Sequence, residues 1–260
     1  MAPPSIFRRG KRGMQAPVGP ALGEKYVYKD TELRAAIGEV AARYATRGDL
    51  TASQGGRIVI ADSWKTSGYV IPPQCAGLMI TALPGCRLFP SDGPGTQTLF
   101  DVRAADVEIN RVVAGIADYA FAKLVEAGIG TLNGASVSAE RLTVERCTIS
   151  GAVLYNDASG GLASYAQIIR NRHINTGKTD VIFVDSDSCI VDGNALQALS
   201  SILNVLRVGS NGGRCRIVKN DVDHGIIHTS ASSGENVIAM NVNTLTITRN
   251  PASDEVGMNT

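Results

Sequence analysis

The stretch Cys189–Leu196, CIVDGNAL, decides the fold of this chain because its pattern recurs. Copies with the same internal spacing are LTVERCTI (142–149), AQIIRNRH (166–173), CRIVKNDV (215–222), LTITRNPA (245–252) and, more loosely, VEINRVVA (107–114). The five regular copies begin 24, 23, 26 and 30 residues apart. A repeat of this length predicts one small structural unit stacked on itself many times.

The columns of this repeat separate an inner face from an outer one. The first, third and eighth positions, here Cys189, Val191 and Leu196, are apolar in most copies. Alternation with a period of two places the first and third positions on one side of a strand. Apolar runs between the copies are expected to supply the other strands of each unit: VLY (153–155), VIFV (181–184), ILNVL (202–206), GIIH (225–228) and NVIAM (236–240).

Asn occupies the sixth position in four of the five regular copies, at Asn171, Asn194, Asn220 and Asn250. Asn tolerates left-handed backbone angles, and its side chain can bond to nearby backbone or to an Asn in the next unit. We therefore expect an Asn ladder at a bend between two strands. Together with the repeat length, this ladder predicts an all-β chain, a parallel β-helix with one rung for about 24 residues.

The region before the repeats predicts one helix followed by short strands. Asp30–Thr46 carries an apolar stripe at helical spacing, with Asp30 as a suitable N-cap, and we expect it to cover one open end of the stack. Expected strands are RIVIAD (57–62), YVI (69–71), LMITAL (78–83), RLF (87–89) and TLFDV (98–102). Residues 117–128 fit either a helical turn or a strand with a loop.

The predicted organisation has four parts: an extended arm (1–23), a capping-helix region (24–50), the parallel β-helix (51–252) and a C-terminal tail (253–260). The arm is rich in Pro and Gly and carries clustered cations, so it is expected to stay loosely attached or to order on a partner. Its candidate partner-binding residues are Ile6, Phe7, Arg8, Arg9, Lys11 and Arg12.

Composition excludes several classes of function. The net charge is +1, so no overall field selects a nucleic acid or a membrane surface, and we expect no specific nucleic-acid partner. No apolar run is long enough to cross a membrane, and no apolar stretch of a signal peptide follows the N-terminal charges, so synthesis in a reducing cytoplasm is expected. The five cysteines form no CxxC pair, and we predict neither a metal site nor a cofactor.

Several segments together resemble a known fold family. They are the helix at 30–45, GGRIVIADSWKTSGYVI (55–71), LMITALPGCRLF (78–89), and the IVKN and TITRN rungs. These resemble the right-handed parallel β-helix of the pectate-lyase-like superfamily, in the compact form common among bacteriophage appendage proteins. The likeness covers roughly residues 25–250. It implies the fold and leaves activity open, because this fold carries lyases, hydrolases and inert virion parts.

The resemblance also implies where catalysis would occur. Enzymes of this fold use carboxylates on an outer face, and glycoside hydrolysis needs two of them about 5 to 10 Å apart. A weak candidate set is Asp180, Asp185, Asp187 and Asp192, which Asp221 or Asp223 could extend. We favour the alternative that Asp and Ser after VIFV are turn residues closing a rung. No catalytic residue is therefore assigned.

The remaining polar columns have structural explanations beside functional ones. His173 lies in an apolar column and is expected to pack inside, while His224 and His228 are too far apart along a strand to share a metal. Cys189 and Cys215 share a column and are expected to be stacked free thiols. The fifth position is mostly basic and forms either a solvated face or a docking stripe for an acidic partner: Arg111, Arg146, Arg170, Lys219 and Arg249.

These observations predict a non-enzymatic structural protein of a bacteriophage virion: a spike, a fibre base or a capsid decoration anchored through its arm. The resemblance implies a homotrimer, and the expected partners are other virion proteins of the capsid or tail, with a host glycan as a further candidate. The alternative is a tail-spike-like protein that binds or cleaves a glycan.

Overall fold

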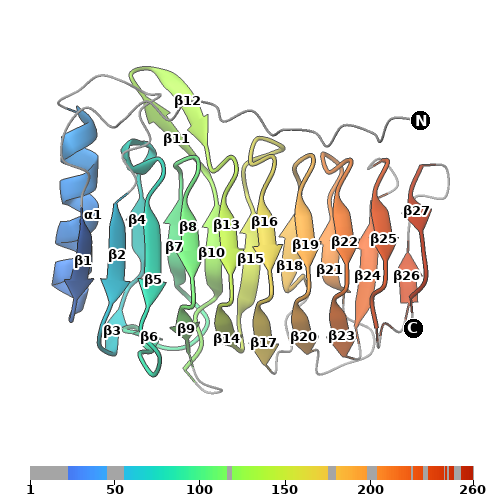
Figure 1. The fold of residues 1–260 in the computed structure, drawn as a ribbon, viewed down its shortest axis with the longest axis horizontal. Coiled ribbons are helices and arrows are strands. Elements are labelled where there is room, and N and C mark those ends of the chain that lie inside the picture. Colours follow the sequence, from blue (N-terminus) through green and yellow to red (C-terminus); the bar gives the residue numbers. More distant parts are fainter. Residues whose placement is uncertain are drawn as a thin grey trace, which may run out of the picture.

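The computed structural model describes residues 23–45, 56–115, 119–174, 180–197, 204–223, 225–230, 234–242, 244, 246–248 and 253–259. The chain forms three parallel sheets, as in a β-helix, and the strands of each sheet are stacked along one axis (Figure 1). Sheet A has ten strands: β1 (Glu24–Val27), β2 (Arg57–Ile60), β5 (Met79–Ala82), β8 (Glu108–Asn110), β13 (Thr143–Glu145), β16 (Gln167–Ile169), β19 (Ile190–Asp192), β22 (Arg216–Val218), β25 (Val237–Ala239) and β27 (Glu255–Val256).

The other two sheets complete each rung. Sheet B has seven strands: β3 (Trp64–Thr66), β6 (Leu88–Pro90), β9 (Val113–Ala114), β14 (Thr148–Ser150), β17 (Arg172–Ile174), β20 (Ala195–Gln197) and β23 (Asp221–Asp223). Sheet C has eight: β4 (Tyr69–Ile71), β7 (Thr98–Val102), β10 (Lys123–Ala127), β15 (Val153–Asp157), β18 (Ile182–Val184), β21 (Asn204–Val208), β24 (Ile226–Thr229) and β26 (Thr246–Thr248).

The repeat columns predicted from the sequence are confirmed in register. Val144 of β13 pairs with Ile109 of β8 and with Ile168 of β16, so the third positions stack directly. Side chains at the first, third and eighth positions are buried in one continuous core, including His173. Parallel strands stack about 4.8 Å apart. Each inward column therefore contributes one side chain to every layer of the core.

Most of the non-glycine residues with left-handed backbone angles lie at the two ends of the sheet A strands; the exceptions are Asn133 in the β11–β12 turn and Asp180 before β18. Arg141 and Arg146 flank β13 with φ of 56° and 54°. The corner between sheets A and B holds the second of these columns: Arg111, Arg146, Arg170, Gly193, Lys219 and Met240. The expectation that the corner Asn itself would take this conformation was wrong, because the residue before it makes the bend and leaves Asn free to point inward.

The Asn ladder expected at this corner is confirmed and is fully buried where it is regular. Asn194 Oδ1 accepts hydrogen bonds from the backbone N (2.9 Å) and Nδ2 (3.0 Å) of Asn171, and its own Nδ2 donates to Ile168 O (2.8 Å) and to Asn220 Oδ1 (2.9 Å). The Asn ladder contains Asn171, Asn194, Asn220, Asn241 and Asn259. Each carboxamide thus joins three successive rungs.

The last copy of the repeat was assigned wrongly from the sequence. Thr246–Thr248 belongs to sheet C, whereas Val237–Ala239 of NVIAM forms the next strand of sheet A and brings Asn241 into the ladder. Residues 253–260, expected as a tail, include β27, which pairs with β25. Asn250 lies outside the described residues. The wrong assignment arose because TITRN has the same order of residue types as the copies of the repeat that form sheet A strands.

The helix α1 (Asp30–Ala45) lies across one end of the stack, as predicted (Figure 1). It buries Leu33, Ala36, Ile37 and Val40 in the common core. The sequence did not reveal β1, which precedes α1 and adds a parallel edge strand beside β2. Across the described residues, no helix is both long and apolar enough to cross a membrane.

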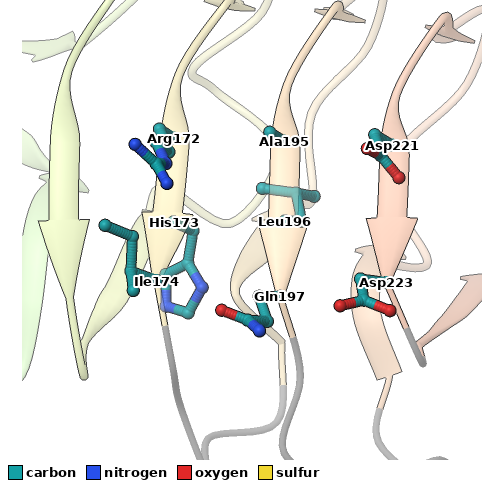
Figure 2. Close-up of a pocket in the computed structure, with 8 residues that line it drawn as sticks. All are labelled: Arg172, His173, Ile174, Ala195, Leu196, Gln197, Asp221 and Asp223. Atoms are coloured by element: carbon teal, nitrogen blue, oxygen red, sulfur yellow. The ribbon is translucent and has the colours of Figure 1, made fainter.

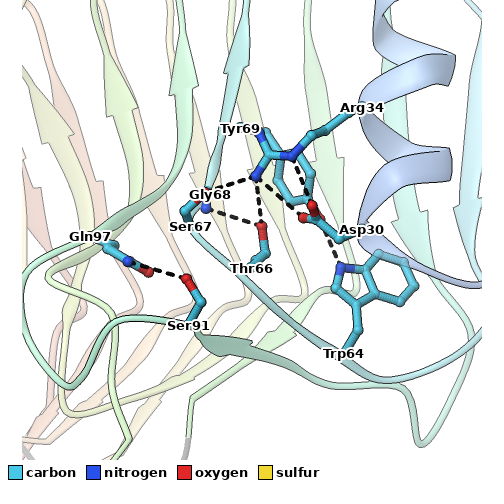
Figure 3. Close-up of polar contacts among 9 residues, drawn as sticks. All are labelled: Asp30, Arg34, Trp64, Thr66, Ser67, Gly68, Tyr69, Ser91 and Gln97. Carbon is cyan, nitrogen blue, oxygen red and sulfur yellow. Dashed lines mark hydrogen bonds and ion pairs between the residues drawn. The ribbon is translucent and has the colours of Figure 1, made fainter.

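Polar contacts lock α1 onto the first rungs (Figure 3). Tyr69 donates its phenolic hydrogen to Asp30 Oδ1 (2.8 Å) and accepts from Trp64 Nε1 (2.7 Å), while the Arg34 guanidinium lies 4.9 Å from the centre of the Tyr69 ring. Partial burial favours protonated Asp30, but the hydrogen bonds from Arg34, Thr66 and Tyr69 outweigh it and keep the pKa of Asp30 below its usual value.

Segment 117–128, for which a helical turn or a strand was expected, forms a strand over Lys123–Ala127, and residues 116–118 lie outside the described part. An antiparallel hairpin follows, made by β11 (Ile129–Leu132) and β12 (Ala135–Ser138). In Figure 1 this hairpin projects beyond the ends of the parallel strands. It interrupts the rungs without changing the register, because β13 still pairs directly with β8.

Candidate functional site

A shallow pocket of about 160 Å³ lies on sheet B, across β17, β20 and β23 (Figure 2). Parallel pairing aligns Arg172 with Ala195, and Ala195 with Asp221, so these three outward residues form one row across three rungs. A second row contains Ile174, Gln197 and Asp223. The alternation of the strands points both rows outward, while His173 and Leu196 between them point into the core.

The pocket carries opposite charges at its two ends. Arg172 lies two rungs from Asp221, a separation of about 10 Å between their Cα atoms. Ala195 lies between them and is exposed, and its short side chain leaves a depression in the middle of the row. Gln197 adds both a donor and an acceptor beside Asp223 (Figure 2). Such a row can bind a ligand that has an anionic group at one end and hydroxyl groups at the other.

The corner beside the pocket also lacks a long side chain in the rung that contains Ala195. Gly193 replaces the cations that precede and follow it in the corner column, Arg170 and Lys219. A Cβ at Gly193 would lie 3.5 Å from Cγ of Arg170, so the Arg170 stem extends over this glycine. One rung, CIVDGNALQ, therefore presents Gly and Ala to the outside where both neighbouring rungs present long charged side chains.

The floor of the pocket contains an unusual histidine. His173 is 2% exposed, its Nε2 lies 2.8 Å from Ala152 O, and its Nδ1 has no hydrogen-bond partner among the described residues. Burial lowers the pKa of His173 to about 4, since the charged form would lose its hydration. The imidazole is therefore neutral near pH 7 and acts as a packed core side chain, as the sequence predicted.

The carboxylates selected from the sequence do not converge. Asp180 precedes β18 and faces Arg207, whose Nε lies 3.0 Å from its Oδ1. Burial raises the pKa of Asp180, and the nearby Arg207 opposes this shift. Asp185 and Asp187 follow the opposite end of β18, so about five residues of extended chain, some 16 Å, separate them from Asp180.

Asp185 and Asp187 are both used to bind the next rung. Asp185 accepts hydrogen bonds from Asn211 N (3.0 Å) and Asn211 Nδ2 (2.9 Å), and Asp187 forms an ion pair with Arg214. Asp192 is the last residue of β19, five residues after Asp187. The interpretation of these residues as turn residues that close a rung thus agrees with their contacts.

A buried carboxylate that sequence analysis did not select occupies the same turn. Asp157 is 3% exposed; its Oδ1 accepts from Ser159 N and Oγ, and its Oδ2 accepts from Asp185 N and Ser186 Oγ. Four hydrogen bonds to one carboxylate match the full acceptor capacity of the ionised form. Asp157 therefore fastens two successive turns between sheets C and A.

The predicted thiol column and basic column are both present. Cys189 and Cys215 are buried free thiols in adjacent rungs, and their mutual hydrogen bond together with burial raises the pKa of Cys189. Arg111, Arg146, Arg170 and Lys219 are all exposed at the corner, and Arg146 has an ion pair with Glu145 at 3.4 Å. Arg249 and the arm residues Ile6, Phe7, Arg8, Arg9, Lys11 and Arg12 lie outside the described part of the chain.

Sequence analysis missed Arg172, Ala195 and Gln197 because only the inward, corner and basic columns were compared. The seventh position of the repeat changes from Arg to Ala to Asp in three successive copies, which was a readable signal. Asp221 and Asp223 were noted only as extensions of a different acidic patch. Within the described ranges, no three His, Cys, Asp or Glu side chains gather as a metal site would require.

Comparison with solved structures defines the fold. An ι-carrageenase complexed to ι-carrageenan fragments superposes with a TM-score of 0.50 at 13% identity, over 93% of this chain and 59% of the other. This chain is a right-handed parallel β-helix. A Geobacillus virus E2 ORF18 protein gives a TM-score of 0.38 at 16% identity, over 80% of this chain and 53% of the other.

A third match is a 1,3-α-1,4-β-D-galactose-4-sulfate-3,6-anhydro-D-galactose-2-sulfate 4 galactohydrolase, with a TM-score of 0.36 at 13% identity, over 93% of this chain and 64% of the other. The β-helix thus spans about three-fifths of the length of these solved chains. No family model and no curated protein matches its sequence. At these identities the likeness shows the fold and leaves the function to be argued from the side chains.

Proposed function

We propose that this β-helix is a non-enzymatic structural protein of a bacteriophage virion, a spike, a fibre base or a capsid decoration, made in the cytoplasm of the host bacterium. The observation that carries the proposal is the use of buried polar side chains as links between rungs. The Asn ladder and Asp157 direct their hydrogen bonds along the axis of the stack. Such links stiffen a rod in the direction in which a virion appendage carries load.

The carboxylates that an enzyme of this fold would present are used in the same way here. Asp185, Asp187 and Asp180 each contact a residue of the next rung, namely Asn211, Arg214 and Arg207. The sequence resemblance to bacteriophage appendage β-helices adds the class of particle. We extend the proposal to a homotrimer that docks on other virion proteins through residues 1–23.

Purified particles test this proposal. Full-length protein should co-sediment with intact virions on a density gradient, in a constant ratio to the capsid protein. A deletion of residues 1–23 should remain folded, with an unchanged thermal unfolding midpoint, and should be absent from the particles. Absence of the full-length protein from virions would refute the structural role, and normal incorporation of the deletion would refute the anchor.

A second candidate function, cleavage of a glycan, is favoured by Asp221 and Asp223. They alternate with buried Val222 on β23, which places both carboxylates on the outer face with Cα atoms about 7 Å apart. Side chains on Cα atoms this far apart can hold their carboxyl groups at the separation of about 5 to 10 Å used in glycoside hydrolysis. Release of reducing ends from host capsule polysaccharide, lost in both Asp221→Asn and Asp223→Asn, would support this function. Unchanged release in both variants would exclude these carboxylates.

A further inference from the structure

We propose that the sheet B pocket across β17, β20 and β23 binds an acidic sugar residue of a glycan, with the acid group at Arg172 and sugar hydroxyls at Asp221, Asp223 and Gln197. The proposal deepens the second candidate function by naming the class of sugar. It concerns binding alone, so it applies equally to a virion rod that attaches to a glycan without cleaving it.

The cationic end of the pocket is available to an anion. Arg172 is exposed, and its guanidinium forms no ion pair or hydrogen bond with any residue that the structure describes; the same holds for the guanidinium of Arg170 at the adjoining corner. Among the described residues, ten other arginines or lysines have an ion-pair partner, including Arg141 and Arg207. A guanidinium left exposed beside a pocket provides a planar fork that matches a carboxylate or a sulfate.

The shape of the pocket follows from the gap in a single rung. Gly193 and Ala195 leave the CIVDGNALQ rung low between the Arg170–Arg172 rung and the Lys219–Asp221 rung. The volume of about 160 Å³ is well below the roughly 300–1,000 Å³ of a pocket for a drug-sized ligand. This space suits a single ring, held between two raised rungs, with the rest of the chain in solvent.

The opposite end of the pocket selects sugars over other polyanions. Asp221 and Asp223 provide acceptors for hydroxyl groups, and Gln197 provides an acceptor and two donors. A nucleic acid would bring phosphates against these two carboxylates. The eight lining residues include no Phe, Tyr or Trp, and the imidazole of His173 is buried, so none of them is available to stack on a base. An acidic peptide would meet the same repulsion. A ring with one acid group and several hydroxyls satisfies both ends.

The test is titration calorimetry with five probes of known charge: a mannuronic acid hexamer, a sulfated dextran hexamer, neutral dextran hexamer, hexaglutamate and a single-stranded DNA hexamer. We expect the wild-type chain to bind the mannuronate or the sulfated hexamer at least tenfold more tightly than the other three. Binding of neither acidic sugar, or equal binding of dextran, hexaglutamate or DNA, would overturn the proposal.

Matched variants locate the site. Arg172→Gln should weaken binding of the acidic sugar about tenfold or more, the loss expected for one hydrogen bond to a charged group. Arg216→Gln removes another exposed cation, on sheet A, and should leave binding unchanged. Ala195→Leu should block the pocket at an unchanged unfolding midpoint. Equal losses in the Arg172 and Arg216 variants would show unspecific charge attraction and would overturn the site.

The same titrations separate this inference from cleavage. Asp221→Asn and Asp223→Asn should each weaken binding, whether or not the wild-type protein releases reducing ends. Tight binding of the acidic hexamer without product release would support the inference and reject the cleavage function. Product release without any dependence on Arg172 would reject the inference and leave the cleavage function standing.

Discussion

The two halves of the β-helix close the same corner by different means. Between sheets A and B, the earlier rungs place Val112 and Cys147 at the sixth position, whereas the later rungs place the Asn ladder there. Each ladder Asn donates to the carbonyl of the third-position residue in the preceding rung, as Asn171 does to Val144 O at 2.9 Å. At Cys147 the thiol lies 3.5 Å from the equivalent carbonyl, Ile109 O.

This difference shows how much of the corner is geometry and how much is bonding. The backbone bend is the same in both halves, because Arg111 and Arg146 take positive φ just as Lys219 does. An apolar side chain is sufficient to fill the corner, but it leaves the inward carbonyl with a weak thiol donor or none from the side chain. The Asn ladder adds hydrogen bonds between neutral groups of successive rungs and leaves the backbone bend unchanged.

Breaking the ladder should have the largest effect. Asn194→Leu removes four buried side-chain hydrogen bonds, to Asn171 N and Nδ2, to Ile168 O and to Asn220 Oδ1. We expect the free energy of unfolding to fall by about 4 kcal/mol, measured by urea denaturation. Gln167→Leu makes a similar amide-to-Leu change on the exposed face of β16 and should cost less than about 0.5 kcal/mol. Similar losses in the two variants would contradict the ladder.

Lowering the pH should destabilise the protein through His173, two residues after Asn171 of the ladder. His173 has a folded pKa of about 4 against 6.5 when unfolded, so the unfolded state binds a proton that the folded state excludes. His173 therefore costs no stability above about pH 6.5, and it lowers the free energy of unfolding as the pH drops from 6.5 toward 4, by about 3 kcal/mol at most. In His173→Leu this part of the pH dependence should vanish. An unchanged slope in that variant would show that other groups cause the loss.

Extending the Asn ladder by one rung into the earlier half should stabilise the protein. In Cys147→Asn the new Nδ2 is positioned to donate to Ile109 O, and the stability should rise by about 1 kcal/mol. Cys147→Ala, which removes the thiol and adds no donor, should lose about 1 kcal/mol. Thermal unfolding of both variants against the wild type measures this. A Cys147→Asn protein less stable than Cys147→Ala would mean that the earlier corner has no room for a carboxamide.

Relieving the bend should have the smallest effect and the same one in both halves. Arg146→Gly and Lys219→Gly remove side chains from left-handed residues with φ of 54° and 58°. Gly lacks the steric cost of that conformation but gains entropy when unfolded, so each variant should gain only about 0.5 kcal/mol. A gain confined to one half, in urea titrations of the two variants, would show that the bend is not shared.

The sequence was sufficient to predict the stacked rungs, the helix at one end and the buried columns. Those features depend on periodicity, which CIVDGNAL and its copies repeat faithfully. The sequence could not show which of NVIAM and TITRN forms the sheet A strand. Both segments have the residue alternation of a strand, and only their pairing partners distinguish sheet A from sheet C. The positive φ of Arg170 was also missed, since a non-Gly residue before Asn gives no local signal for it.

The candidate site was less predictable for a physical reason. From the sequence, Asp185 and Asp187 were weak catalytic candidates beside the favoured interpretation as turn residues. Their partners, Asn211 and Arg214, come from the next rung and are visible only in three dimensions. The pocket depends on what is absent from one rung, Gly193 and Ala195, rather than on a motif. Such a gap becomes a pocket only because the outward residues of the rungs on either side are longer and charged.

The central claim is that each rung is divided into an inner set of side chains that holds the rod together and an outer set that is available for binding. Calorimetric titration of the acidic hexamer into Arg172→Gln, on protein whose unfolding midpoint has been measured, tests it most directly. We predict an unchanged midpoint and binding weakened at least tenfold. Undiminished binding, or a fall in stability comparable to that of Asn194→Leu, would contradict the account.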